Sequence, residues 1–191
     1  MPLQDRPSST PPRHAARAAP GKHPATRAPL YTAEERARRD ATRWTLVQGL
    51  LAPLQFLVFG ISLVLVLRWF ATGEGFVAAT VSVVLKTALL YTIMVTGSIW
   101  EKVVFGRWLF APAFFWEDVV SMAVLALHTA YLVALFTGAL SPRGQLLLAL
   151  AAYATYVVNA AQFVWKLRLA RLDGQAAART TAPQGAQEAL G

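Results

Sequence analysis

Long apolar segments separated by short polar ones are the dominant pattern of this sequence. Each apolar segment is long enough for an α-helix to cross the hydrocarbon core of a bilayer, which takes about 20 residues. Gly, Pro or charged residues lie between them and favour turns. The pattern predicts an all-α, polytopic bundle of four transmembrane helices over residues 44–70, 76–100, 116–138 and 145–167, within a membrane domain of residues 31–171.

The segments outside this domain have no apolar period. Residues 1–30 form a basic tail rich in Pro, Ala, Arg, Ser and Thr, and residues 172–191 are rich in Ala, Gln, Gly and Thr, so both are predicted to be disordered. The first tail lacks the apolar stretch of a secretory signal, and a cytoplasmic tail near anionic lipid is preferred over a transit peptide. Next to it, Thr32 and Glu35 have capping-box spacing, which predicts a short interfacial helix over residues 31–43.

Composition supports the membrane assignment and excludes several functions. Charged residues make up 15% of the chain, against roughly 25% in soluble domains, and mean hydropathy is +0.43. The net charge of +8 does not indicate nucleic acid, because 9 of the 18 Lys and Arg residues lie in residues 1–43, beside a span. The absence of cysteine excludes disulfides, thiolate metal sites and a Cys nucleophile.

The distribution of basic residues also sets the expected orientation. Lys102 and Arg107 lie in the central connection and four basic residues follow the last apolar run, whereas the other two turns hold only Arg68 and Arg143. The positive-inside rule then places both termini and the central connection in the cytoplasm.

The central connection carries most of the candidate chemistry. Residues 99–122 read IWEKVVFGRWLFAPAFFWEDVVSM and place Glu101, Glu117 and Asp118 among aromatic side chains, with Gly106 and Pro112 bracketing a turn or a short re-entrant piece. A plain connection between spans needs only a turn and a few charges, so the two aromatic–carboxylate clusters predict an active site. Interfacial ion pairs and aromatic belt residues are the simpler alternative.

Polar residues inside the spans mark further candidates. Lys86 lies near mid-bilayer, where ionisable groups are costly and face the bundle interior or a cavity. His128 and Ser121 share a helix face with Glu117. Polar stripes run along the first span and the fourth, and each can form interhelical hydrogen bonds or a pocket wall (Gln48, Gln55 and Ser62; Thr155, Asn159, Gln162 and Lys166).

Recognised cofactor and metal signatures are absent. The sequence has no Walker A, dinucleotide-type glycine loop, HExxH or GxSxG motif, and no His pair at metal-ligand spacing. No cofactor and no metal held by the protein are therefore expected, which leaves acid–base chemistry by carboxylate, Lys and His.

A family resemblance adds a specific reaction. The segments LVQGLLAPLQFLVFGISLVLVLRW and LLYTIMVTGSIWEKVVFGRWLFAPAFFWEDVVSMAVLALHTAYL resemble the 3-vinyl bacteriochlorophyllide hydratase family of bacteriochlorophyll biosynthesis, over roughly residues 31–171. The resemblance implies a hydro-lyase that adds water across the C3 vinyl group of a chlorophyllide-type tetrapyrrole and gives a 1-hydroxyethyl group. It also implies that the substrate carries its own magnesium, and that the protein lies in the bacterial inner membrane or an intracytoplasmic photosynthetic membrane.

The resemblance gives the candidate residues their expected roles. Proton transfer falls to Glu101, Glu117 and Asp118, because one of two adjacent carboxyls in an apolar interface can stay protonated while the other is ionised. Lys102 or Arg107 would pair with the propionate, and His128, or a water it holds, would contact the magnesium. The remaining candidates would stack on the macrocycle or form the pocket wall: Trp100, Phe114, Phe115, Trp116, Lys86, Asn159 and Gln55.

Other functions stay open at this point. The same residues fit a non-catalytic pigment-binding or carrier membrane protein, or a structural subunit of a photosynthetic complex. A pigment carrier needs a ligand His and apolar walls, whereas three carboxylates at one membrane face favour the hydratase. The expected partners are the tetrapyrrole substrate, the lipid bilayer and other enzymes of bacteriochlorophyll biosynthesis, with no nucleic acid.

Overall fold

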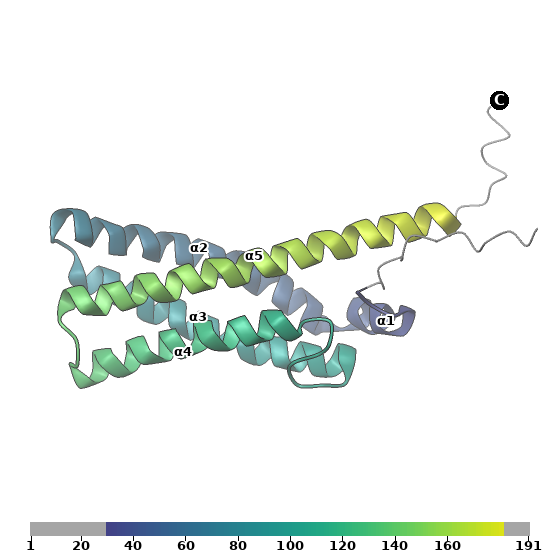
Figure 1. Cartoon of the computed structure of the whole chain (residues 1–191), viewed down its shortest axis with the longest axis horizontal. Coiled ribbons are helices and arrows are strands. Elements are labelled where there is room, and N and C mark those ends of the chain that lie inside the picture. The colour runs from purple at the N-terminus through teal and green to yellow at the C-terminus, as the bar shows by residue number, and fades with distance from the viewer. Residues whose placement is uncertain (1–29, 182–191) are drawn as a thin grey trace, which may run out of the picture.

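The computed structural model describes residues 30–181, which form five α-helices and no strand. Four long helices run side by side, and a short helix lies at one end of the bundle (Figure 1). The predicted all-α bundle is confirmed, whereas the predicted tails at residues 1–29 and 182–191 lie outside the described residues. The helices are α1 (Ala33–Ala41), α2 (Arg43–Thr72), α3 (Phe76–Phe105), α4 (Phe115–Thr137) and α5 (Pro142–Thr181).

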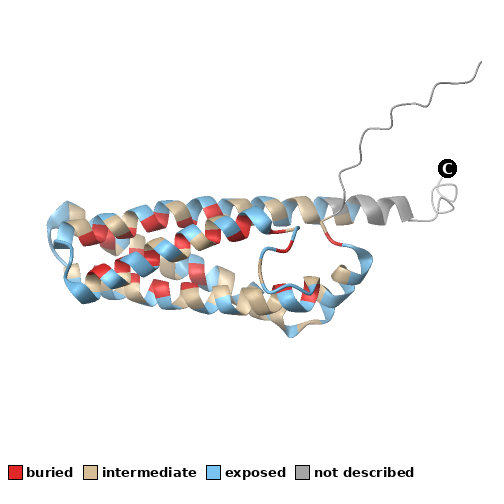
Figure 2. Ribbon diagram, turned by 60° about the horizontal axis from the view of Figure 1, so that its bottom comes forward, coloured by how far each residue is buried: buried red, intermediate tan, exposed pale blue. Residues whose placement is uncertain are grey.

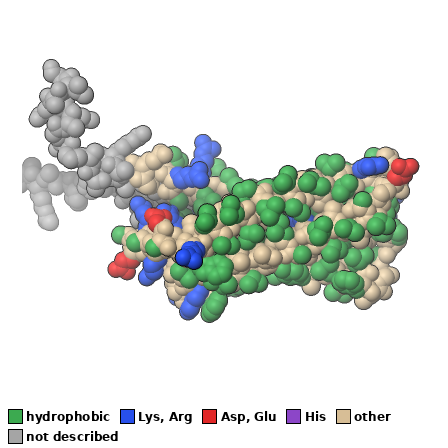
Figure 3. Space-filling view, turned by 180° about the vertical axis from the view of Figure 1, so that it is seen from behind, with side chains coloured by type: hydrophobic (Ala, Val, Ile, Leu, Met, Phe, Trp, Pro, Cys, Tyr) green, Lys and Arg blue, Asp and Glu red, His purple; other side chains and the backbone are tan. Residues whose placement is uncertain are grey.

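The four long helices have the length and composition of membrane spans. The shortest, α4, has 23 residues, so at 1.5 Å per residue it is about 35 Å long, against about 30 Å for the hydrocarbon core. Apolar side chains cover most of the bundle's flank, and charged side chains gather at its two ends (Figure 3). Many large apolar residues are exposed on that flank, as lipid contact requires. The chain is a multi-pass membrane protein.

Two helices continue beyond their predicted ends. α3 extends to Phe105 rather than to residue 100, because no Gly or Pro follows residue 100 until Gly106, whose φ of 78° ends the helix. α5 continues through residues 172–181, which the pattern assigned to the tail, because no Pro interrupts this Ala-rich stretch. The non-helical connection between α3 and α4 is therefore residues 106–114, shorter than the residues 101–115 that the predicted spans leave between them.

The predicted capping box starts α1. The Thr32 hydroxyl accepts from the Glu35 N–H at 3.2 Å, and the Glu35 carboxylate accepts from the Thr32 N–H at 2.8 Å. Arg38 Nε donates to the Val104 carbonyl at 2.9 Å, which attaches α1 to the last turn of α3. The short helix is thus fixed against the end of the bundle.

The bundle consists of two helical hairpins, α2 with α3 and α4 with α5. Buried residues line the facing sides of the helices (Figure 2). The main apolar core lies toward the end with the turns after α2 and α4, and includes Val66, Ala79, Val83, Tyr131, Leu146, Ala149 and Tyr153. The opposite end of the bundle, which carries α1, contains a cavity.

A buried hydroxyl chain joins the two hairpins. Ser62 of α2 lies 2.5 Å from the Tyr153 hydroxyl of α5 and 2.7 Å from the Ser82 hydroxyl of α3. Ser62 belongs to the polar stripe of the first span, and Gln48 of the same stripe donates to Thr96 of α3 at 2.8 Å. For these two residues, the expected interhelical hydrogen bonds are confirmed.

This chain yields a stability prediction. Tyr153→Phe and Ser62→Ala should each lower the free energy of unfolding by about 1 kcal/mol, since interhelical hydrogen bonds in membranes contribute roughly 0.6–2 kcal/mol. Steric trapping or denaturation in mixed micelles measures the effect. The double variant serves as the control: a coupling energy near zero would contradict the direct bond between them.

Candidate active site

A cavity of about 740 Å³ lies between the two hairpins, at the end of the bundle that carries α1. All five helices contribute to its wall. Its size lies within the range of about 300–1,000 Å³ that is typical of small-molecule sites. Apolar side chains such as Leu90, Ile93 and Met94 make up much of the lining, with a few buried polar groups between them.

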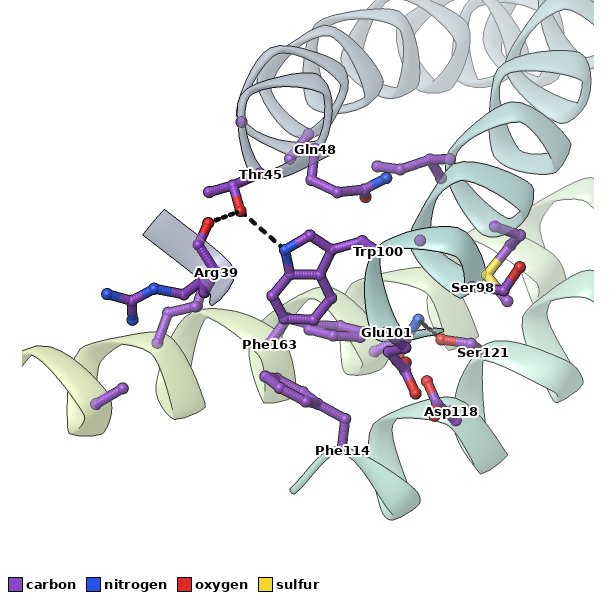
Figure 4. Close-up of a pocket in the computed structure, with 18 of the residues that line it drawn as sticks. Arg39, Thr45, Gln48, Ser98, Trp100, Glu101, Phe114, Asp118, Ser121 and Phe163 are labelled. Atoms are coloured by element: carbon purple, nitrogen blue, oxygen red, sulfur yellow. Dashed lines mark hydrogen bonds between the residues drawn. The ribbon is translucent and has the colours of Figure 1, made fainter. Parts of the chain in front are cut away.

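Two buried carboxyl groups face each other in the cavity wall. Glu101 comes from the last turns of α3 and Asp118 from the first turn of α4, with exposed fractions of 5% and 3%. Figure 4 shows their carboxyl groups pointing toward one another. Two carboxyls held side by side away from water are a recurrent arrangement for general acid–base chemistry.

Consecutive backbone N–H groups of the connection hold this pair. The Phe110 N–H donates to Asp118 at 2.8 Å, and the Ala111 N–H donates to Glu101 at 3.2 Å. Phe110 has a φ of 58°, a left-handed conformation that few bulky residues adopt. Such a turn lets successive N–H groups converge on acidic oxygens. Strained conformations of this kind concentrate at functional sites.

Two amide oxygens in the cavity wall have no hydrogen-bond partner among the groups that the structure describes. They are Gln55 Oε1 of α2 and Asn159 Oδ1 of α5, on residues that are 2% and 8% exposed. The other end of the Asn159 amide donates to Ser121 at 2.8 Å, which fixes its orientation. Because buried acceptors are nearly always satisfied, these two oxygens require a donor from a water or a ligand.

An aromatic wall lies beside the carboxyl pair. The Trp100 ring packs edge-on against Phe114 at 5.8 Å, and Phe163 of α5 stacks on Phe114 at 5.9 Å with planes 21° apart. The Trp100 N–H donates to Thr45 at 3.0 Å, so the indole is fixed in orientation (Figure 4). Burial raises the pKa of the nearby Tyr31 phenol, against the opposing charge of Arg39, so this ring is neutral at neutral pH.

Glu117 lies apart from the other two carboxyls. Its carboxylate pairs with Lys166 of α5 at 2.5 Å, and it is not part of the cavity wall. Successive helix residues point about 100° apart, so Glu117 and Asp118 cannot face the same neighbour. The structure therefore brings together only two of the three predicted carboxyls, and it gives the third a partner in α5.

Lys86 and His128 form a separate cluster in the bundle interior. Both side chains are fully buried, with Lys86 Nζ 3.2 Å from His128 Nε2 and 3.8 Å from the centre of the Tyr156 ring. His128 Nδ1 lies 2.8 Å from the Val124 carbonyl, which can only accept, so Nδ1 carries the proton. Both ring nitrogens are thus engaged. Neither residue lines the cavity.

Four other predicted binding residues point away from the cavity. Trp116 and Phe115 are 69% and 43% exposed on the flank of α4, and Lys102 and Arg107 are exposed at the end of the bundle. Lys102 donates to the Gly106 carbonyl at 2.9 Å, across the end of α3. Among the predicted residues, the cavity wall holds Glu101, Asp118, Trp100, Phe114, Gln48, Gln55, Ser121 and Asn159.

Sequence reasoning missed several wall residues. Arg36, Arg39 and Asp40 of α1 were given no role in the site, yet they are part of the cavity wall. Phe163 received no role, although it follows directly on Gln162 in the polar stripe of the fourth span. The signal for α1 was its capping box, which predicted an ordered helix at this end but not its docking on α3.

The fold and the site define a class: a helical membrane protein with a buried carboxyl pair in a large, aromatic-walled cavity. A family model for 2-vinyl bacteriochlorophyllide hydratase matches residues 31–169, and the chain belongs to this family. The 2-vinyl and 3-vinyl names denote the same group in two numberings of the macrocycle. No solved structure matches the chain.

Two relatives carry that same name, 2-vinyl bacteriochlorophyllide hydratase. The protein from Cereibacter sphaeroides is 75% identical over 149 residues, which cover 78% of this chain and 92% of the relative. The protein from Rhodobacter capsulatus is 72% identical over 148 residues, which cover 78% of this chain and 86% of the relative.

The Glu117–Lys166 pair leads to a second prediction. Lys166→Met should lower the free energy of unfolding by about 3 kcal/mol, because it leaves a carboxylate uncompensated in a largely buried position. The double variant Glu117→Gln/Lys166→Met should recover most of that loss. Unfolding in mixed micelles measures both, and an additive loss in the double variant would contradict a mainly structural pairing.

Proposed function

We propose that the cavity between the hairpins is the active site of this hydratase, with Glu101 and Asp118 as its proton-transferring groups. The reaction adds water across the vinyl group of a chlorophyllide-type macrocycle and gives a 1-hydroxyethyl group. The observation that carries the proposal is the pair of buried carboxyls that face each other and are held by the Phe110 and Ala111 N–H groups.

The chemistry of vinyl hydration matches such a pair. Protonation of the terminal vinyl carbon leaves a cation on the inner carbon, where conjugation with the macrocycle spreads the charge. Water then attacks the inner carbon and loses a proton. The enzyme must therefore supply an acid for the carbon, a base for the water, and negative or aromatic surroundings for the cation.

Glu101 and Asp118 can divide these tasks. Two ionised carboxylates side by side repel each other strongly away from water, so the pair keeps one proton near neutral pH. The protonated member gives its proton to the vinyl carbon, and the ionised member accepts one from the attacking water. The pair then holds one proton again, on the other carboxyl, and its return within the pair resets the site.

The two unpartnered amide oxygens suit the attacking water. Water donates two hydrogen bonds, and Gln55 Oε1 and Asn159 Oδ1 are buried acceptors that require donors. A water donating to one of them keeps a lone pair for attack and its second proton for a carboxylate. Ser121 holds the Asn159 amide in the orientation that this role needs.

The aromatic wall suits the macrocycle itself. Trp100, Phe114 and Phe163 offer flat apolar faces next to the carboxyls, and aromatic faces also stabilise a delocalised cation. The substrate supplies its own magnesium, and the reaction requires no further cofactor. His128 is enclosed with both nitrogens engaged, so another group or water would approach that magnesium.

The orientation in the membrane follows from charge. The connection at residues 106–114 and both ends of the described chain lie at one end of the bundle, with α1 (Figure 1). The cavity wall includes residues of α1, so the cavity lies toward the same end. That end carries most of the basic residues, so it faces the cytoplasm, in the inner or an intracytoplasmic photosynthetic membrane. There the enzyme would exchange pigment with other enzymes of bacteriochlorophyll biosynthesis.

The carboxyl pair generates the third prediction. Glu101→Gln and Asp118→Asn should each lower kcat by about 10²- to 10⁴-fold, the usual contribution of general acid–base catalysis. The measurement is conversion of chlorophyllide a in a host that lacks the pathway, with the product analysed for a mass gain of one water. Glu74→Gln, at the far end of the bundle, is the matched control.

Two outcomes would change the assignment. Full activity in both variants would rule out this pair as the catalytic site. A comparable loss in Glu117→Gln that persists in the stabilised Glu117→Gln/Lys166→Met protein would move proton transfer to Glu117. Bound pigment without any hydrated product would favour a carrier instead.

The water site gives the fourth prediction. Gln55→Met and Asn159→Leu keep the side-chain volume roughly but remove the acceptors, and each should lower kcat by about tenfold, since one hydrogen bond in a transition state contributes roughly 1.4 kcal/mol. The KM should change little if the amides bind water rather than pigment. A rise in KM with kcat unchanged would instead assign them to substrate binding.

A further inference from the structure

The mouth of the cavity is cationic. Three arginines line it, Arg36 and Arg39 from α1 and Arg171 from α5, against one acid, Asp40. The deeper wall is mainly apolar, with the carboxyl pair, the amides and a few hydroxyl groups as its polar groups. The cavity therefore has a positively charged entrance and an apolar interior, a distribution that suits a flat apolar molecule with one anionic substituent.

The three arginines differ in the contacts that their guanidinium groups already make. Arg39 pairs with Asp40 at 2.7 Å, and its guanidinium lies 4.8 Å from the centre of the Tyr31 ring. Arg36 and Arg171 form no ion pair with any side chain that the structure describes. On different helices of the cavity wall, these two guanidinium groups can therefore bind an anion.

We propose that Arg36 and Arg171 bind the propionate carboxylate of the pigment, and so make the enzyme select the free acid over its esters. This inference rests on the proposed function, since it names the group that anchors the same substrate. Guanidinium groups bind carboxylates through paired, charge-assisted hydrogen bonds. A carboxylate held at the mouth leaves the apolar macrocycle in the cavity, toward Glu101 and Asp118.

The position of the mouth supports the same arrangement. It lies at the charged end of the bundle, where a carboxylate can remain near water, whereas ionised groups deep in the bilayer are costly. Arg36 sits on a helix that the Thr32–Glu35 capping box and the Arg38–Val104 hydrogen bond hold in place. Lys102 and Arg107, which the sequence suggested for this role, are exposed and outside the wall.

The experiment compares two substrates in the full-length protein, reconstituted in nanodiscs of uncharged lipid: the free-acid pigment and its methyl ester. Arg36→Gln and Arg171→Gln should each raise KM for the free acid about tenfold, the usual effect of losing one charge-assisted hydrogen bond, with kcat unchanged. KM for the ester should stay the same in every variant. Arg168→Gln, an exposed basic residue of α5 outside the cavity wall, is the matched control.

The comparison of the free acid with its methyl ester distinguishes the possible outcomes. An equal rise in KM for both substrates would overturn the inference, because it would indicate that the arginines anchor lipid or support the fold. An unchanged KM for the free acid in the double variant, or a selective rise in Lys102→Gln or Arg107→Gln, would also overturn it. If the wild-type protein hydrates acid and ester equally well, only this inference fails; if it hydrates neither, the proposed function fails as well.

Discussion

The site depends on two consecutive backbone N–H groups. Glu101 and Asp118 end up side by side in a largely apolar enclosure, where their mutual repulsion opposes the arrangement. The Phe110 and Ala111 N–H groups offset that repulsion by donating one hydrogen bond to each carboxyl. Because those N–H groups belong to the connection between α3 and α4, the path of these nine residues sets the position of both carboxyl groups. This geometry requires a left-handed backbone conformation at Phe110, which is unfavourable for a bulky residue.

The division of the bundle into two hairpins makes room for the cavity. The apolar core and the Ser62–Tyr153 contact hold the hairpins together toward the end with the turns after α2 and α4. Toward α1 the space between them is lined by aromatic and amide groups instead. The ionisable groups that do not line the cavity are satisfied internally: Lys166 compensates Glu117, and Lys86 lies against His128 and an aromatic ring. These contacts give the groups partners outside the cavity, so that the carboxyl groups in the cavity wall are only Glu101, Asp118 and the exposed Asp40.

The fold could be predicted from hydropathy and helix capping, because both depend on residues that are close together in the sequence. The four spans and the Thr32–Glu35 cap follow from residues close in the chain, whereas the site required knowledge of which faces meet. Glu117 and Asp118 are adjacent in sequence and equivalent in chemistry, yet one faces α5 and the other the cavity. The same limit explains the aromatic residues: Trp100 and Phe114 turn inward while Phe115 and Trp116 turn outward, and no sequence pattern distinguished the two pairs.

α1 shows how a charged helix at a membrane interface can belong to an active site. A helix with no buried residue and several charges has the pattern of a solvated element, and its intrinsic stability over nine residues is low. Docking on α3 through Arg38 changes its role, because it brings the guanidinium of Arg36 to the rim of an apolar cavity. An amphiphilic pigment has to leave the bilayer with its macrocycle still shielded and its carboxylate still near water. A cavity that is apolar inside and cationic at the rim meets both requirements, so the polar helix completes the site that the apolar helices enclose.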